Sequence, residues 1–420
     1  CSQYRVCCHK YPRVTVNHRP DINPSPVSAA DRERRDAAAG IQTTDRFARF
    51  SQRNDMFNRA FWDDEIRRPE MMAFFDSYRK VPSFRRGGGF SQKDFALRNA
   101  AWAVSDEFSS RGESEGIREG FNAPLRPTAQ VASKRIEVEN RDAMTAEIKQ
   151  IAKLFGAGIV GIAPYDPRWT YANRVSSTTF EEDDTGLPEG LTSVVVLGHE
   201  MDRALVDTYP SAVAGAATGN AYSEETATVI RLSQYIRNLG WQAVGSMNDS
   251  ALVIPYALQA GLGEYARNQL VITPEYGPRV RFSKVLTDLP LVHDQPRLLG
   301  VRRFCDVCTR CIDACPVKAL PSGPPLDVQL NRSAIQGVIK WTSDAEKCFG
   351  FWADLRSDCA ICLRVCPWNR DFGYWWNRVW RWFARTPARG WLIKLENLSK
   401  RGRRKQSTNW WKRIRSVTRR

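Results

Sequence analysis

Two cysteine runs near the carboxyl end constrain the fold of this chain more than any other feature. They hold eight of its eleven cysteines. The first run has the spacing C-x-x-C-x-x-C-x-x-x-C-P, and the second keeps C-x-x-C-x-x-x-C-P but sets its first cysteine eleven positions upstream. The runs are Cys305, Cys308, Cys311 and Cys315 before Pro316, and Cys348, Cys359, Cys362 and Cys366 before Pro367.

This spacing is that of a bacterial ferredoxin, in which three thiolates of one run hold a 4Fe–4S cube and the fourth crosses to the other cube. We therefore expect one cluster to be held by Cys305, Cys308, Cys311 and Cys366. The second cluster is expected to be held by Cys348, Cys359, Cys362 and Cys315. Because such a pair passes electrons one at a time, a redox site should lie at the end of the path.

Zinc and disulfide bonds are the two alternatives for these cysteines. Zinc sites use paired C-x-x-C units and need neither a third cysteine three positions on nor a trailing proline. Disulfide scaffolds are small and rich in cysteine throughout, whereas this chain has 420 residues and gathers its cysteines in one segment. Both alternatives are therefore weaker than two iron–sulfur clusters.

The composition is that of a soluble globular protein of two or three domains, with 42% hydrophobic and 26% charged residues. No apolar run approaches the roughly 18–20 residues that would span a bilayer. The chain begins with Cys1, so a targeting peptide would not be visible in it. We expect no ligand role for Cys1, Cys7 or Cys8.

The net charge of +16 is concentrated in the last fifty residues. Residues 371–420 hold 15 Lys and Arg against two acids, a balance of +13 that leaves +3 for the rest of the chain. The same segment holds seven of the fourteen tryptophans. This mixture favours either the headgroup layer of a membrane or a solvated basic tail with some rings packed on the body, and we leave the two open. Nucleic acid is less favoured, because no recognisable binding module accompanies the charge.

Four regions are expected along the chain: a loop-rich and helical cap (1–125), a helix–strand domain (126–295), the cysteine domain (296–370) and the basic tail (371–420). Helix and strand alternate in the second region, which indicates an α/β core. Helices are predicted over residues 69–78, 92–108, 143–155 and 223–239. Strands are predicted over residues 158–163, 193–198, 242–246 and 270–273.

Residues 211–291 are dense in small residues and turns, which let a backbone approach a large flat ligand closely. The alternative is tight helix–strand packing, but two clusters downstream favour a planar cofactor. A Rossmann fingerprint is not completed by Gly261 and Gly263, and there is no C-x-x-C-H for haem. The chain has four histidines, none of them two positions after an aspartate as in the D-x-H-x-x-G loop that ligates cobalamin: His9, His18, His199 and His293.

Longer segments between residues 46 and 369 then point to one family. They are residues 56–62 (MFNRAFW), 94–102 (DFALRNAAW), 161–169 (GIAPYDPRW), 199–202 (HEMD), 215–223 (GAATGNAYS), 259–263 (QAGLG), 268–281 (NQLVITPEYGPRVR) and 287–291. With the cysteine runs, they resemble the corrinoid-dependent reductive dehalogenases, which carry cobalamin without a histidine ligand beside two 4Fe–4S clusters. The resemblance implies an α+β fold, with a cobalamin-binding, nitroreductase-like α/β core and a bacterial-ferredoxin-like two-cluster domain.

The resemblance also implies residue roles. Tyr222 would donate a proton, Arg281 (or Arg279, if the register slips) would polarise it, and Asn248 would pose the substrate. A neighbouring guanidinium favours the phenolate and so makes the hydroxyl a better acid. Trp352 is expected in the aromatic wall of the substrate pocket, and Phe57, Trp62 and Trp102 are weaker candidates for its entrance. Cobalamin contacts are expected at Thr218, Gly219, Gly261, Gly263, Arg267 and Asn268.

The implied activity is removal of halide from an organohalide, a haloalkene or haloarene, by cobalt(I) fed from the two clusters. A separate electron donor and a small integral membrane anchor are the expected partners, at the outer face of the cytoplasmic membrane, with the cytoplasm as the alternative. The rival enzyme is an epoxyqueuosine reductase acting on tRNA. It is disfavoured because that family has an aspartate acid where this chain has Tyr222. A ferredoxin-like carrier with a membrane-docking tail is the non-enzyme alternative, and it would leave residues 126–295 without a role.

Overall fold

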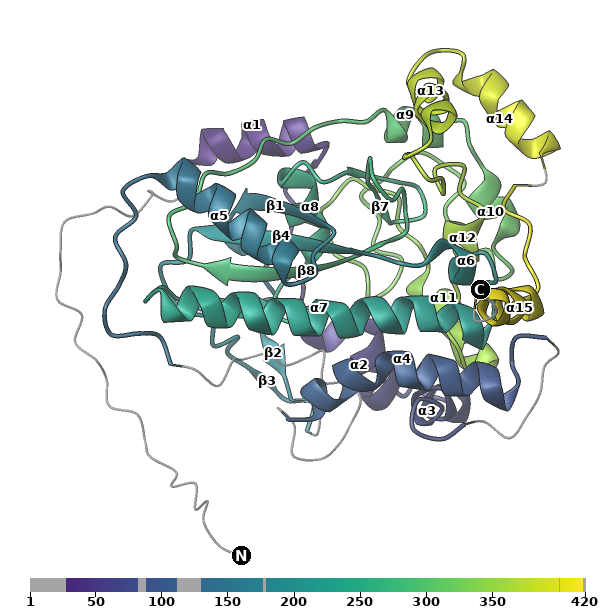
Figure 1. The fold of residues 1–420 in the computed structure, drawn as a ribbon, viewed down its shortest axis with the longest axis horizontal. Coiled ribbons are helices and arrows are strands. Elements are labelled where there is room, and N and C mark those ends of the chain that lie inside the picture. The colour runs from purple at the N-terminus through teal and green to yellow at the C-terminus, as the bar shows by residue number, and fades with distance from the viewer. Residues whose placement is uncertain (1–27, 82–87, 112–129, 177–178, 400, 418–420) are drawn as a thin grey trace, which may run out of the picture.

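A computed structural model describes residues 28–81, 88–111, 130–176, 179–399 and 401–417. Cys1, Cys7, Cys8, His9 and His18 lie outside the described residues. The fold consists of helices packed around a small antiparallel sheet (Figure 1). This agrees with the expected mixture of helix and sheet.

The central sheet has the strand order β1-β4-β8-β5, and every neighbouring pair in it is antiparallel. Its strands are β1 (Ile159–Pro164), β4 (Ser193–Glu200), β5 (Ala243–Ser246) and β8 (Val280–Thr287). β1, β4 and β5 match predicted strands. β8 was not predicted, because the prolines and glycine just before it were taken as part of a turn. The other strands form two short pairs, β2 (Arg174–Val175) with β3 (Glu182–Asp183) and β6 (Glu264–Tyr265) with β7 (Val271–Ile272).

Alternate residues of the sheet enter two separate cores. In β4, Val195 and Leu197 pack with α5 (Arg141–Leu154) and α7 (Ala212–Asn238), whereas Val194 and Val196 pack with α8 (Val253–Gln259) and α1 (Ala29–Ala39). Figure 1 shows α1 and α7 on opposite sides of the sheet. This alternation is the period of two that a strand buried on both faces must satisfy.

The helix predicted over residues 223–239 is confirmed as the second half of α7, but its predicted start is wrong, because α7 begins eleven residues earlier. Ser211 caps it by accepting a hydrogen bond from the amide of Ala214 at 3.0 Å. The small residues before Tyr222, which suggested the close approach of a flat ligand, form the alanine-rich first half of this 27-residue helix. Alanine is the best helix former, and small side chains let another helix approach closely. That neighbour is α4 (Gln92–Arg111), which lies along α7 in Figure 1.

The cysteine segments and the end of the chain share one core. Cys305 and Cys308 are buried with Trp380, Ala384 and Ile393, which come from the predicted basic tail. Among the described helices, none is both long and apolar enough to cross a bilayer. The remaining helices are α2 (Met56–Trp62), α3 (Pro69–Asp76), α6 (Arg203–Val206), α9 (Val301–Cys305), α10 (Arg310–Ala314), α11 (Ala345–Leu355), α12 (Ile361–Arg364), α13 (Trp375–Ala384), α14 (Arg389–Leu398) and α15 (Ser407–Val417).

Candidate active site

The cysteine side chains gather in two groups, and the last cysteine of each run stands with the other run. Burial raises the pKa of Cys366, and the neighbouring thiols of Cys305, Cys308 and Cys311 raise it further. In the second group, burial raises the pKa of Cys348 to about 12, with Cys359 and Cys315 acting on it. The fold therefore brings together the two sets of four thiols that the spacing predicts.

Burial raises the pKa of every thiol for which a shift is resolved, so the reduced, metal-free cysteines are held as thiols. Cys311 reaches about 12 and Cys359 about 11. Iron binding must displace these protons, since thiolates are the ligands of iron–sulfur clusters.

Tyr222, Arg281 and Asn248 meet where α7, β8 and the end of β5 come together. The hydroxyl oxygen of Tyr222 accepts a hydrogen bond from Asn248 Nδ2 at 2.7 Å and another from Arg281 Nη2. The Arg281 guanidinium also lies 4.0 Å from the centre of the tyrosine ring. Two donors on one phenolic oxygen, one of them cationic, stabilise the phenolate that remains after a proton leaves.

The alternative candidate Arg279 does not share in this group. Its guanidinium pairs with Glu200 and donates to the carbonyl of Met201 at 3.1 Å. Successive side chains of a strand point to opposite faces, so residues 279 and 281 share a face in principle, but Arg279 precedes the regular strand. It is Arg281 that contacts Tyr222.

Two buried charged residues next to Tyr222 were not predicted. Glu225, one helical turn after Tyr222, is fully buried, and neither carboxylate oxygen has a hydrogen-bond partner among the described residues. Burial raises its pKa to about 7, against the opposing charges of Arg281 and Lys284. Lys284 Nζ donates to the Met247 carbonyl at 2.7 Å, and burial lowers its pKa to about 8. The only signal in the sequence was a glutamate one turn from the tyrosine, on a helix whose buried face was unknown.

The guanidinium of Arg281 also links Tyr222 to the second cysteine group. Burial alone would lower the pKa of Arg281, but Tyr222, Glu225 and Asp358 outweigh it and raise the pKa above its usual value. Asp358 immediately precedes Cys359. The tyrosine therefore lies close to a segment that is expected to ligate the second cluster.

Trp102 packs directly on Tyr222, and Phe57 and Trp352 pack against the same hydrophobic cluster; of these three predicted pocket residues, Phe57 is among the described residues that line the cavity introduced below. Trp102 stacks on Tyr222 with ring centres 4.6 Å apart and 27° between the planes. The ring centres of Phe57 and Trp352 lie 6.3 Å apart in a neighbouring group of aromatic side chains. Trp62 instead donates its indole N–H to the carbonyl of Arg53.

A large cavity lies beside this group, between the sheet domain and the cysteine domain. Its volume is about 860 Å³, at the upper end of the range for cofactor sites. Asn248, Tyr171 and Phe57 are in its wall, and its far side is formed by residues 298–303 and 333–345. Four cations line it, and two acids face them: Arg302, Arg303, Lys340 and Arg385 against Asp55 and Glu264.

None of the six predicted cofactor contacts is among the described residues that line this cavity. Thr218 shares a 2.7 Å hydrogen bond with the hydroxyl of Tyr209, and Gly219 faces the ring of Trp102. Gly261 and Gly263 face backbone carbonyls that a Cβ would meet at 2.3 and 2.5 Å, so they serve close packing. Arg267 donates to the carbonyl of Cys305, and Asn268 is buried nearby.

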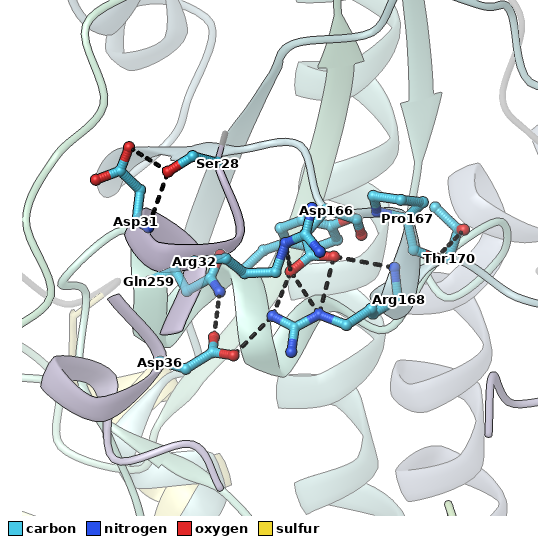
Figure 2. Close-up of polar contacts among 10 residues, drawn as sticks. Ser28, Asp31, Arg32, Asp36, Asp166, Pro167, Arg168, Thr170 and Gln259 are labelled. Atoms are coloured by element: carbon cyan, nitrogen blue, oxygen red, sulfur yellow. Dashed lines mark hydrogen bonds and ion pairs between the residues drawn. The ribbon is translucent and has the colours of Figure 1, made fainter. Parts of the chain in front are cut away.

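A polar network connects the elements that form one wall of the cavity (Figure 2). Arg168 donates to Asp166 and to Asp36, each at 2.6 Å, and Gln259 donates to the other oxygen of Asp36 at 2.8 Å. Asp36 belongs to α1, and Gln259 ends α8. The network thus joins α1, whose last turn lines the cavity, to the end of β1 and to α8.

The fold and the grouped thiols define an iron–sulfur protein with a double-cluster domain, and residues 304–369 match the family described as 4Fe-4S double cluster binding domain. The chain is 32% identical over 349 residues to a tetrachloroethene reductive dehalogenase of Desulfitobacterium hafniense. The match covers 67% of this chain and 63% of that relative, so the chain spans less than two thirds of its length. By sequence, the chain is therefore similar to reductive dehalogenases over about two thirds of its own length.

Two solved structures have the same fold. The structure of a catabolic reductive dehalogenase superposes with a TM-score of 0.67 at 21% identity, over 87% of this chain and 48% of that one. A reductive dehalogenase whose structure suggests a mechanism for B12-dependent dehalogenation gives 0.65 at 20% identity, over 87% and 49%. An epoxyqueuosine reductase of Cyclobacterium marinum is 31% identical, but over only 36% of this chain and 50% of that protein.

Proposed function

We propose that the protein is a reductive dehalogenase that removes halide from an organohalide, either a haloalkene or a haloarene. The observation that carries the proposal is the meeting of Tyr222 with Arg281 and Asn248 beside a large cavity and the cysteine groups. Each turnover would consume two electrons and one proton and would replace the carbon–halogen bond by a carbon–hydrogen bond, with release of halide. Cobalamin, when bound, would supply the reduced cobalt that this chemistry needs.

The cavity fits such a cofactor by its size and its wall. The alanines and glycine of residues 37–40 and the apolar side chains of residues 251–258 offer a surface for a broad ring. Arg302, Arg303 and Lys340 would meet a phosphate group at the edge. Neither described histidine, His199 or His293, lines the cavity, so this chain would bind the cofactor without a histidine ligand. We also propose that the core of the protein has a nitroreductase-like fold.

In the proposed reaction Tyr222 donates the proton, and hydrogen bonds from Asn248 and Arg281 fix the position of its hydroxyl group. Asn248 both contacts the tyrosine and lines the cavity, so it would fix the position of a substrate relative to the hydroxyl. Arg281 cannot give up its own proton and acts as a fixed positive charge. Phe57 and Tyr171 would bind the substrate by dispersion and exclude water.

Electrons would come from a separate donor through the two clusters. The donor, a small integral membrane anchor and a location on the outer face of the cytoplasmic membrane are part of the proposal, and the basic, tryptophan-rich end of the chain supports membrane contact.

The test is Tyr222→Phe, reconstituted anaerobically with cobalamin, iron and sulfide. Loss of the hydroxyl should lower halide release by about 10²–10⁴-fold, the usual contribution of a positioned acid. The control is Tyr235→Phe, the same change on the same helix, where the hydroxyl meets Glu147 at the surface. Equal halide release by Tyr222→Phe and wild type, at equal cobalt and iron content, would remove Tyr222 from the reaction. Release by neither protein on any organohalide would remove the proposed activity itself.

A further inference from the structure

The helix α13 exposes an apolar stripe to solvent. Trp375, Val379 and Trp382 stand at i, i+4 and i+7, which places them on one side of a helix. Trp375 is 66% exposed and Trp382 61%. The opposite side of the same helix is buried, because Trp380 and Ala384 enter the core of the cysteine domain. Such a helix has apolar residues on both sides, whereas an ordinary surface helix is polar outward.

The helix α14 repeats the arrangement with the same spacing. Trp391, Leu395 and Leu398 stand at i, i+4 and i+7, and Trp391 and Leu398 are 69% and 83% exposed. Its opposite side enters the same core through Ile393. The two helices contact each other, and Figure 1 shows them together at one corner of the molecule. Because both bury their other side in one core, both stripes face away from it. We call the six stripe residues the outer apolar face.

Positive charge accompanies the outer apolar face. Four cations lie on α13, on α14 or between them, and none has an ion-pair partner among the described residues: Arg378, Arg381, Arg389 and Lys394. The one acid of α14, Glu396, is buried and paired with Arg370, so it offsets none of their charge at the surface. Exposed indoles mixed with unpaired cations match the interfacial layer of a bilayer with anionic lipids.

We propose that the outer apolar face of α13 and α14 is a docking surface for an anionic lipid bilayer. The tryptophans would enter the headgroup layer while the cations meet lipid phosphates, which is how amphipathic helices lie in an interface. The inference names the surface for the membrane contact in the proposed function and rests on that part of it, but not on the dehalogenase activity.

The position of this surface has a consequence for electron transfer. Trp380 and Ile393 share their core with Cys305 and Cys308, the expected ligands of the first cluster. A bilayer at the outer apolar face would therefore lie next to that cluster, so a membrane-bound donor would meet the first cluster before the second.

The test is sedimentation of the iron–sulfur holoprotein with vesicles of phosphatidylcholine, with and without phosphatidylglycerol. The variant is Trp375→Ser, Trp382→Ser, Trp391→Ser. The matched control makes the same kind of change at exposed apolar residues elsewhere: Val104→Ser, Leu154→Ser, Leu326→Ser. Iron content and visible absorption check that each protein keeps its clusters.

Wild type and control should sediment with anionic vesicles. The affinity of the tryptophan variant for these vesicles should be lower by at least about tenfold. Raising salt from ~0.1 M to ~1 M, which shortens the Debye length from about 10 Å to about 3 Å, should weaken wild-type binding. Equal binding by the tryptophan variant and wild type would overturn the proposal. So would wild type that ignores lipid vesicles and binds only when they contain an integral membrane protein, because the face would then be a protein interface.

Discussion

At the scale of single residues, burial changes the protonation of Glu225. It is fully buried without a hydrogen-bond partner among the described residues, and its charge acts on Arg281 and Lys284. Its pKa rises from 4.5 to about 7, so between these values the folded protein keeps a proton that the unfolded chain has lost. Stability from this group is complete below about pH 4.5 and is lost as the pH rises through about 7.

Glu225→Gln should therefore become more stable relative to wild type as the pH rises. The difference in unfolding free energy should change by about 3 kcal/mol between the two pKa values, because one pKa unit corresponds to about 1.4 kcal/mol. Urea unfolding from pH 4.5 to 8 measures it, and comparing variant with wild type cancels the opposite slope from His199, whose pKa is lowered to about 4.

Glu224→Gln is the control for this prediction, since Glu224 is the exposed neighbour on the same helix. Its stability curve should run parallel to that of wild type. Parallel curves for Glu225→Gln as well would mean that Glu225 is charged in the folded protein throughout this range.

At the scale of elements, the packing of α4 on α7 positions Tyr222. Gly219 lies one turn before the tyrosine, and a Cβ there would stand 2.4 Å from the ring of Trp102. Trp102 in turn stacks on Tyr222. The glycine is therefore needed for the stacking rather than for contact with a cofactor, and its absence from the cavity wall follows from the same packing.

Gly219→Ala should push Trp102 away from Tyr222 and destabilise the protein by about 1–3 kcal/mol, the usual cost of overpacking. Gly390→Ala is the control, because a Cβ there meets nothing within 4 Å and alanine favours a helix. Thermal unfolding of both variants tests this. A Gly219→Ala protein as stable as Gly390→Ala would show that α4 can shift to accommodate a methyl group.

At the scale of the whole molecule, the two cysteine runs are joined by their crossed last cysteines. Cys366 stands with the first run, 51 positions after Cys315 in the chain. Each cluster would therefore bind cysteines from both runs and so link the two parts of the cysteine domain. Losing one cluster should leave the other with all four of its ligands.

Two double variants test the crossing by iron content. Cys308→Ala with Cys366→Ala removes two ligands of one cluster and should leave about four irons per chain. Cys362→Ala with Cys366→Ala, which are neighbours in sequence, removes one ligand from each cluster and should leave fewer irons, with both electron paramagnetic resonance signals altered. The reverse pattern would assign each run to its own cluster.

The sequence by itself determined what depends on short-range spacing. The spacing within each cysteine run and the strands at β1, β4 and β5 lie in local patterns of the sequence. Tyr222, Asn248 and Arg281 lie in three separate segments and were identified by resemblance to a family, and the fold brings them together. The small residues before Tyr222 did not reveal the first half of α7, since alanines and glycines suit both the close approach of a ligand and a helix that another helix approaches closely.

Only the tertiary structure decided which side chains meet across the chain. α7, β8 and α4 come together from distant segments of the chain. As a result the buried charge of Glu225 acts on Arg281 and Lys284, and Gly219 lets the ring of Trp102 pack directly against α7. Likewise, the described part of the basic tail forms three helices, and two of them, α13 and α14, bury one side in the core that holds Cys305 and expose the other, which the composition did not specify. Burial and long-range contact are properties of the packed chain, so no local pattern could encode them.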